Sequence, residues 1–316
     1  MKGRSIVLAG FLVAASPLFA GSDEPGDWLQ RMTAAVQHTD YEGTVIRIQN
    51  GTAEALKVVH IVSDGVIREK VIVQEGDGLE IIRNGNEVHS ILPDSKTVLV
   101  EEWDDQSTLF STLPSSDIRF GSEYDVAIVR RDRVAGRNAV MLAVRPHDSY
   151  RYGHRIWLDV ATGFPLQTKL IDVDGTAIEQ VKFADIRLGE TIREESLQSS
   201  INTAGFRWFA EPKKVVRTEI ESDWVSDNLP PGFRSVSAHA ENEAGRAERV
   251  THMMFSDGLA NVSVFIEPSG DENAPRRAQV GTSTSFSVTI NGSRVTAVGE
   301  VPAATTEQIA RSMQPR

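Results

Sequence analysis

Cysteine is absent from the 316 residues of this chain, which excludes disulfide cross-links, thiol nucleophiles and thiolate metal sites together. Positive charge is also scarce, with 33 Lys and Arg residues against 44 Asp and Glu residues and a formal net charge of −11. Because such a surface repels nucleic-acid phosphates, we expect no nucleic-acid partner. A local basic patch could form from Lys213, Lys214 and Arg217, and the simpler interpretation of these residues is a solvated linker edge.

Long apolar runs are missing after residue 20. Before it, Lys2 and Arg4 precede an apolar run over 6–15, which ends in a short segment closing with Ala20. This order predicts a signal peptide over 1–20 and export to the periplasm, although Leu18 leaves the exact cleavage point open. The alternative is a transmembrane anchor, for which the run is short. Removing residues 1–20 lowers Lys plus Arg from 33 to 31 against 44 acids, so the net charge becomes −13.

Catalytic motifs are missing as well. The seven histidines include no His-Glu-x-x-His pattern, and the chain has neither a Gly-x-Ser-x-Gly elbow nor a phosphate-binding glycine loop. The densest metal-capable group is His147, Asp148 and His154, for which a polar hairpin is the favoured interpretation. We therefore expect no catalytic residue, no cofactor and no metal site, and a protein that is not an enzyme; a hydrolase of the cell envelope is the weakest alternative.

Residue pairs that favour tight turns recur in the part of the chain that follows. Five Asn-Gly or Asp-Gly pairs separate short apolar runs, at 50–51, 64–65, 77–78, 84–85 and 174–175. Such pairs favour the type I′ hairpin turn, which needs a positive φ at both central residues, so they predict an antiparallel meander. The expected strands lie at 41–49, 56–62, 67–73, 87–92, 98–101, 124–131, 139–145, 154–159, 166–172 and 177–186.

The alternation within these strands predicts one dry and one wet face. Ile67, Val71 and Val73 should face the core, while Arg68 and Lys70 should face water. A helix is expected over 27–36 with Asp27 as its cap, and a second short helix over 105–113. Together these helices should plug the concave face of a curved sheet, a common host for a hydrophobic ligand. The candidates to line that cavity are Trp103, Leu109, Phe110, Leu113, Ile118 and Trp157, and core packing is the alternative for each.

A change in composition near 203–217 divides the chain. We expect a signal peptide over 1–20, a large domain over 21–204, a linker over 205–218 and a small α+β domain over 219–316. The small domain should contain hairpins turning at Asp257-Gly258 and Asn291-Gly292. A capping-box pattern at 305–308 predicts that its last helix runs over 305–313.

Four sets of motifs resemble the RseB/MucB family of envelope-stress regulators, and they span both expected domains. The most specific set is YRYGHRIWLD at 150–159 with TGFPL at 162–166. The others are WLQRM with YEGT at 28–32 and 41–44, FSDGL with VSVFIE at 255–259 and 262–267, and VGEVP at 298–302.

The resemblance implies a mainly antiparallel α+β fold. Its large domain would be a curved half-barrel with a helical plug, similar to the lipoprotein carriers LolA and LolB. The small domain would dock on the periplasmic domain of a membrane-spanning anti-sigma factor of the RseA/MucA type and shield it from site-1 proteolysis. Lipopolysaccharide or lipoprotein acyl chains would trigger release. Homo-oligomerisation stays open, and a lipid or lipoprotein carrier is the alternative function.

Aromatic anchors dominate many interfaces, so the small domain offers candidates for docking the partner. They are Trp224, Phe233, Phe255 and Phe265, and core packing is again the alternative.

Overall fold

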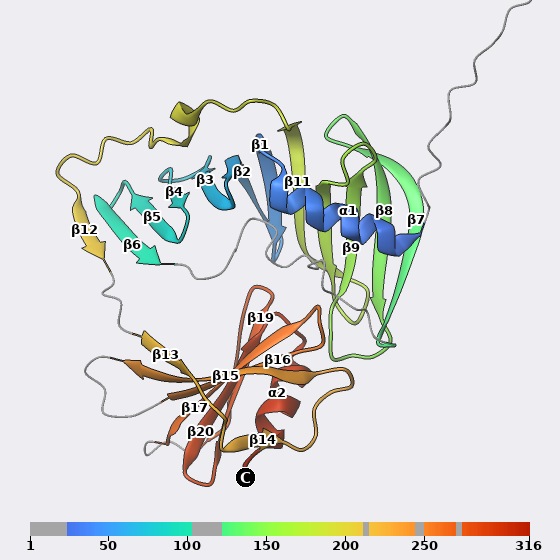
Figure 1. The fold of residues 1–316 in the computed structure, drawn as a ribbon, viewed down its shortest axis with the longest axis vertical. Coiled ribbons are helices and arrows are strands. Elements are labelled where there is room, and N and C mark those ends of the chain that lie inside the picture. The colour runs from blue at the N-terminus through green and yellow to red at the C-terminus, as the bar shows by residue number, and fades with distance from the viewer. Residues whose placement is uncertain (1–23, 103–121, 211–214, 244–249, 270–273) are drawn as a thin grey trace, which may run out of the picture.

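Two large sheets make up most of the structure, a computed structural model that describes residues 24–102, 122–210, 215–243, 250–269 and 274–316 (Figure 1). The first sheet has 12 strands, the second has seven, and a two-stranded sheet lies beside the second. The expected signal peptide and the expected helix over 105–113 lie outside the described residues.

The first sheet is an open half-barrel, as predicted. Its order is β12-β6-β5-β4-β3-β2-β1-β11-β10-β9-β8-β7, and no pairing joins the edge strands β12 and β7 within the described ranges. Its strands are β1 (Tyr41–Gln49), β2 (Thr52–Ser63), β3 (Val66–Val73), β4 (Glu80–Asn84), β5 (Glu87–Leu92), β6 (Thr97–Glu102), β7 (Tyr124–Val134), β8 (Arg137–Pro146), β9 (Gly153–Asp159), β10 (Pro165–Ile171), β11 (Ala177–Leu188) and β12 (Arg207–Ala210). β12 runs parallel to β6, whereas β1 to β11 pair antiparallel.

All five turn pairs connect neighbouring antiparallel strands, as predicted, but the positive φ at both residues that type I′ requires is found in two of them. Asn50-Gly51 and Asp64-Gly65 have positive φ at both residues, 52° and 77° in each case. In the other three pairs only the glycine has a positive φ: Gly78, Gly85 and Gly175. At Asp174 the carboxylate accepts a hydrogen bond from the Thr176 N–H (2.8 Å), as in an Asx turn.

Helix α1 (Pro25–His38) lies across β7, β8, β9 and β11 on the concave side of the sheet (Figure 1). Its Trp28, Leu29 and Met32 pack against apolar residues of β8 and β9. The expected cap was wrong, because Glu24 is the N-cap and Pro25 opens the first turn. Asp27 lies within that turn, where its charge still favours the helix dipole.

The face of β3 that was predicted to be wet is covered at Lys70, whereas Arg68 on the same face stays partly exposed. Lys70 is only 5% exposed, because the chain between β11 and β12 crosses this face as a strap of residues 189–206 (Figure 1). The strap contains the short helix η1 (Glu194–Leu197). The Lys70 ammonium donates to the Gln198 carbonyl (2.5 Å), and the carboxylate of Glu80, 1% exposed, accepts from the Ser199 hydroxyl (2.7 Å) and from Ser200.

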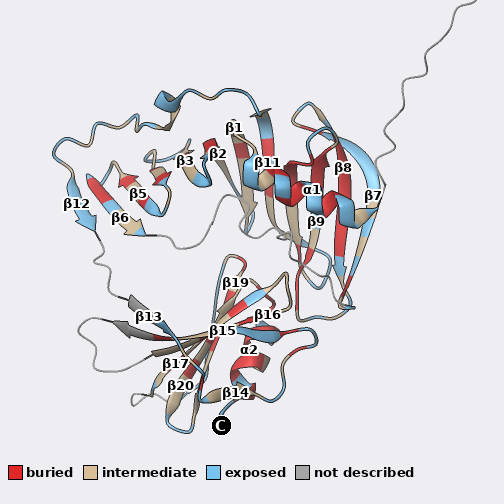
Figure 2. Ribbon diagram, viewed as in Figure 1, coloured by how far each residue is buried: buried red, intermediate tan, exposed pale blue. Residues whose placement is uncertain are grey.

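The second sheet has the order β13-β15-β16-β17-β20-β19-β18. Its strands are β13 (Val215–Glu219), β15 (Arg234–Glu243), β16 (Val250–Ser256), β17 (Asn261–Pro268), β18 (Arg276–Val280), β19 (Ser283–Ile290) and β20 (Ser293–Gly299). Helix α2 (Ala303–Ser312) packs on β19 and β20, and the small sheet joins β14 (Trp224–Ser226) to β21 (Met313–Pro315). Figure 2 shows buried residues concentrated on α1 with the strands beneath it and on α2.

Helix α2 begins two residues earlier than expected. Pro302 is its N-cap, and the Thr305 N–H bonds to the Pro302 carbonyl (2.9 Å), so the capping-box prediction was wrong. The Thr305 hydroxyl is directed to the first part of the molecule instead.

The two sheets are connected at opposite edges of the half-barrel. The chain leaves the first sheet through edge strand β12, and β13 begins the second sheet, so the range 205–218 supplies one strand to each sheet. The non-covalent contacts described below lie mainly at the other edge, around the start of β7 and the loop between β8 and β9, with one more at Gln49 at the end of β1.

Candidate functional site

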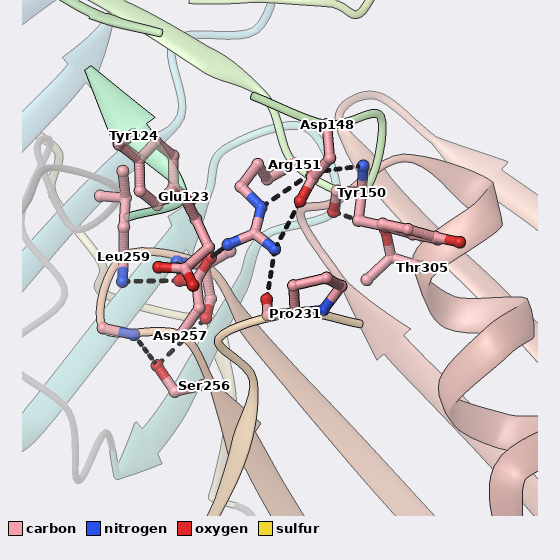
Figure 3. Close-up of polar contacts among 12 residues, drawn as sticks. Glu123, Tyr124, Asp148, Tyr150, Arg151, Pro231, Ser256, Asp257, Leu259 and Thr305 are labelled. Carbon is pink, nitrogen blue, oxygen red and sulfur yellow. Dashed lines mark hydrogen bonds and ion pairs between the residues drawn. The ribbon is translucent and has the colours of Figure 1, made fainter. Parts of the chain in front are cut away.

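A buried arginine joins the two sheets. Arg151 lies in the loop between β8 and β9, and its side chain is 0% exposed (Figure 3). Its guanidinium donates to the Asp257 carboxylate (2.5 Å) and to the Pro231 carbonyl (2.6 Å), both on the C-terminal side. It also pairs with Asp148, three residues before it (Nη2 to Oδ2, 3.0 Å). We refer to Arg151, Asp148, Asp257, Tyr124 and Pro231 as the Arg151 junction.

The turn between β16 and β17 orients Asp257. One carboxylate oxygen accepts the Leu259 N–H (2.9 Å) and the Ala260 N–H (2.7 Å), so the side chain is held by its own turn. The other oxygen is left to face the first sheet, where it accepts from Arg151 and from the Tyr124 hydroxyl (2.8 Å). Both carboxylate oxygens of this buried residue are therefore satisfied.

The loop after β8 orients Arg151 in a similar way. Asp148 Oδ1 accepts the Tyr150 N–H (2.9 Å) and the Arg151 Nε–H (3.0 Å), which sets the direction of the guanidinium. The rings of Tyr124 and Phe233 lie beside that guanidinium, each with its centroid 5.3 Å from Cζ. The cation is thus shared by carboxylates, a carbonyl and two aromatic rings, one from each part.

The charges of the junction are fixed. Burial by itself lowers the pKa of Arg151, but the charges of Asp257 and Asp148 and a hydrogen bond to Asp148 act in the opposite direction, and the net pKa is raised. Burial, followed by the charge of Asp257, raises the pKa of Tyr124 far above its usual range. Arginine therefore stays charged and tyrosine stays neutral at physiological pH, so these two groups serve attachment and do not exchange protons.

Close backbone contacts accompany the charge cluster. A Cβ at Gly232 would lie 2.9 Å from the Glu123 side chain, and one at Gly281 would lie 2.7 Å from the Gln49 amide. Both glycines have positive φ, 77° and 61°, which favours glycine at these positions, whereas the ends of the Glu123 and Gln49 side chains could move aside for a Cβ. The Thr305 hydroxyl adds a hydrogen bond to the Tyr150 carbonyl (2.5 Å).

The candidate cavity residues lie mostly outside the described part of the chain. Trp157 is described: it is 4% exposed, packs in the core with Phe164 and Val45, and donates its Nε1–H to Asp132 (3.1 Å). Its role as a cavity wall stays a prediction. The remaining candidates fall within residues 103–121: Trp103, Leu109, Phe110, Leu113 and Ile118.

The four docking candidates occupy different places. Phe233 lies against Arg151 in the junction, and Phe255, 1% exposed, belongs to the core of the second sheet. Trp224 is partly buried and packs against that core. Phe265 is partly exposed and stacks on His252, with ring centroids 4.4 Å apart. Docking of a partner by these residues stays a prediction.

The histidine cluster does not assemble into one site. Asp148 is engaged by Arg151, whereas His147 points to Asp125 (3.0 Å) and to the Ser122 carbonyl (2.7 Å). Burial lowers the pKa of His154 to about 4. Across the described ranges, no three His, Asp or Glu side chains are grouped so as to hold a metal ion.

Sequence reasoning missed Arg151 and Asp257 as a pair. They lie 106 residues apart, so no local pattern connects them. A usable signal existed all the same, because each lies inside one of the motifs quoted above, 150–159 and 255–259, and the two carry opposite charges.

Comparisons with known proteins cover both parts of the chain. The model of the MucB/RseB N-terminal domain matches residues 24–201, and that of the MucB/RseB C-terminal domain matches residues 218–314. The sigma factor AlgU regulatory protein MucB of Pseudomonas aeruginosa is 32% identical over 325 residues, covering 100% of this chain and 98% of the relative. The sigma-E factor regulatory protein RseB of Escherichia coli K12 is 25% identical over 316 residues, covering 98% of each.

A solved relative shows the same fold. The crystal structure of MucB in complex with MucA(peri) superposes with a TM-score of 0.69 and 31% sequence identity, covering 93% of this chain and 99% of that chain. In the described part of this chain, no helix combines the length and hydropathy that crossing a membrane requires.

Proposed function

The chain belongs to the MucB/RseB family, and on that basis we propose that it is a non-enzymatic regulator of a sigma factor. It binds the periplasmic domain of a membrane-spanning anti-sigma factor and shields that domain from site-1 proteolysis. A lipid or lipoprotein signal releases it. The observation that carries the proposal is the likeness, over 93% of this chain, to MucB solved in complex with MucA(peri).

The proposal includes a cellular localisation and a domain organisation. The protein works in the periplasm after removal of residues 1–20, and its two domains meet within 205–218. Separate family models for the two parts support this division, and so do the separate apolar cores under α1 and α2. The Arg151 junction holds the domains together.

Shielding and release follow from binding equilibria. A tight binder occludes the cleavage segment by mass action, so protection depends on the occupancy of the complex. A lipid releases the anti-sigma factor only if it binds the free or rearranged protein better than the complexed one.

The test is a binding titration of the exported protein with the periplasmic domain of the cell's own anti-sigma factor, with and without lipopolysaccharide. We expect tight binding that lipopolysaccharide weakens. Binding that is indifferent to lipopolysaccharide would keep the regulator and remove the lipid signal. Failure to bind at all would overturn the proposed function and bring the lipid or lipoprotein carrier forward.

A further inference from the structure

A shallow cleft lies beside the Arg151 junction, and each part of the molecule supplies one of its walls. The ring of Tyr150, from the loop between β8 and β9, forms one wall and is directed toward α2 (Figure 3). Residues of α2 and of the loop after β14 form the other wall. The volume of the cleft is about 440 Å³, enough for a few side chains of a polypeptide.

The cleft depends on the junction for its shape. The Tyr150 N–H bonds to the same Asp148 oxygen that receives the Arg151 Nε–H, and the Tyr150 carbonyl accepts from Thr305 on α2. The position of Tyr150 against α2 is therefore set by contacts between the two parts. If those contacts open, both walls remain but the cleft between them is lost.

The chemistry of the lining suits a polypeptide better than an acyl chain. Beside the Tyr150 ring it presents the amides of Asn228 and Gln308, groups that pair with peptide N–H and C=O. Tyrosine is also a frequent anchor for bound peptides, since it offers a large rigid contact area and one polar tip. The Gln308 amide already donates to the Asn228 carbonyl (3.3 Å), and an acyl chain would offer the remaining polar atoms no hydrogen-bond partner.

The charge of the lining favours a basic side chain. Two carboxylates, Asp227 and Glu307, face one guanidinium, that of Arg311. Hydrogen bonds from Arg277 and Arg311 lower the pKa of Glu307, so it is ionised, and it pairs with both Arg277 (2.5 Å) and Arg311 (2.9 Å). The charge of Glu307 is therefore already balanced, and Asp227 is the carboxylate that would meet a basic side chain. The remaining carboxylate, Asp227, has a long bond to Gln314 (3.3 Å) and is exposed.

We propose that this cleft binds a polypeptide segment with a basic side chain, and that the segment belongs to the anti-sigma partner. The inference rests on the proposed function and deepens it by naming a docking surface. Because one wall comes from each part, the partner binds only the joined arrangement, and opening of the Arg151 junction releases it.

Two adjacent alanines of α2 provide a matched test. Ala303 and Ala304 are both exposed in the first turn, but only Ala304 lines the cleft. In titrations of the exported protein with the anti-sigma periplasmic domain, Ala304→Trp should fill the cleft and raise Kd by at least about tenfold. Ala303→Trp should leave Kd within about twofold. Equal affinities for the two variants would overturn the inference.

Two further substitutions separate charge from assembly. Asp227→Asn keeps the shape of the cleft and should weaken binding several-fold and reduce its dependence on salt, as the loss of an ion pair requires. Thr305 lies outside the cleft, and Thr305→Val removes its hydrogen bond to the Tyr150 carbonyl. This variant should weaken binding because Tyr150 is then no longer held as one wall of the cleft. If neither variant changes Kd, neither the charge nor the two-part assembly of the cleft is used.

The outcomes also show which molecule occupies the cleft, and they separate failure of the docking site from failure of the proposed function. Sedimentation of each variant measures self-association. If Ala304→Trp changes self-association and leaves the affinity for the partner unchanged, the cleft binds a second copy of this chain and the proposal is overturned. Absence of wild-type binding would overturn the proposed function itself, whereas normal wild-type binding with an indifferent Ala304→Trp overturns only the docking site.

Discussion

The rings of Tyr41 and His60 are stacked on neighbouring strands of the first sheet, with centroids 4.7 Å apart and planes inclined by 13°. His60 Nδ1 lies 2.8 Å from the Glu69 carboxylate. The Tyr41 hydroxyl and His60 Nε2 are buried and have no hydrogen-bond partner in the described part of the chain. Burial, then the charge of Glu69, raises the pKa of Tyr41 well above its ordinary value, so the folded state opposes its ionisation.

Tyr41, Tyr124 and Tyr152 should therefore titrate late in the folded protein. The pKa of Tyr152 is also raised by burial, to about 12, and that of Tyr124 is raised further. In the unfolded chain these groups ionise near pH 10 while the folded state keeps their protons, so stability should fall as pH rises above about 10. Absorbance at 295 nm near pH 10.5 should report fewer tyrosinates in the native protein than in guanidinium, and Tyr41→Phe should narrow that difference. Equal native and unfolded titrations would contradict the burial of these hydroxyls.

The partly buried His154 should make the protein acid-sensitive. Burial lowers the pKa of His154 to about 4, whereas the unfolded chain binds this proton near pH 6.5. The unfolded state is then favoured as pH falls from about 6.5 to 4, and stability should decrease by on the order of 2 kcal/mol. Urea unfolding at pH 7.5 and at pH 5 measures how the free energy of unfolding changes with pH, and His154→Gln should make that change smaller.

The matched control for this prediction is the exposed His147. Hydrogen bonds to Asp125 and to the Ser122 carbonyl raise its pKa, so its contribution grows as pH falls and has the opposite sign. His147→Gln should leave the acid sensitivity in place. A pH dependence that disappears in His147→Gln and persists in His154→Gln would show that the wrong histidine was chosen.

Loss of the Glu80 carboxylate should release the strap. Glu80→Ala removes the acceptor of the Ser199 and Ser200 bonds and leaves the buried Lys70 ammonium without the nearby carboxylate (3.9 Å). We expect a destabilisation of roughly 3 kcal/mol. Limited trypsinolysis should cleave faster after Arg193, within the strap. Glu195→Ala changes an exposed residue of the same strap and should neither destabilise the protein nor speed cleavage. Unchanged cleavage in Glu80→Ala would mean that other contacts hold the strap.

Trp157 offers a direct test of the expected lipid cavity. If acyl chains enter the concave face, brominated lipid should quench the fluorescence of this residue, which is 4% exposed to water. Trp157→Phe should then lose more of the quenching than Trp208→Phe, because Trp208 is 53% exposed on edge strand β12. Equal losses would place the lipid elsewhere.

The antiparallel fold could be predicted because its signals are local. Asn50-Gly51 and Asp64-Gly65 specify tight turns, and the alternation around Val71 specifies a core-facing side. The burial of Lys70 could not be predicted in this way, since it depends on Gln198, 128 residues away, and on a strap without periodicity. The same holds for β12, which pairs with β6 across more than a hundred residues.

Less of the candidate site than of the fold could be predicted from the sequence. Aromatic residues were nominated because they anchor interfaces, and one of them, Phe233, does lie at the junction, beside Arg151. A lone arginine or aspartate is usually solvated, so Arg151 and Asp257 carry no local signal of burial. Their burial becomes visible only when both parts are placed together, and that placement has no local signature.

The two sheets are joined at opposite edges of the half-barrel, by the backbone on one side and by a set of non-covalent contacts around Arg151 on the other, so the molecule forms a closed loop. The backbone closes one side through β12, and Arg151 with Asp257 closes the other. Each opening of the junction therefore leaves its halves tethered, at an effective concentration set by the chain and not by the amount of protein in the cell. Opening of an interface between tethered halves is a unimolecular step, so its extent should not change when the protein is diluted.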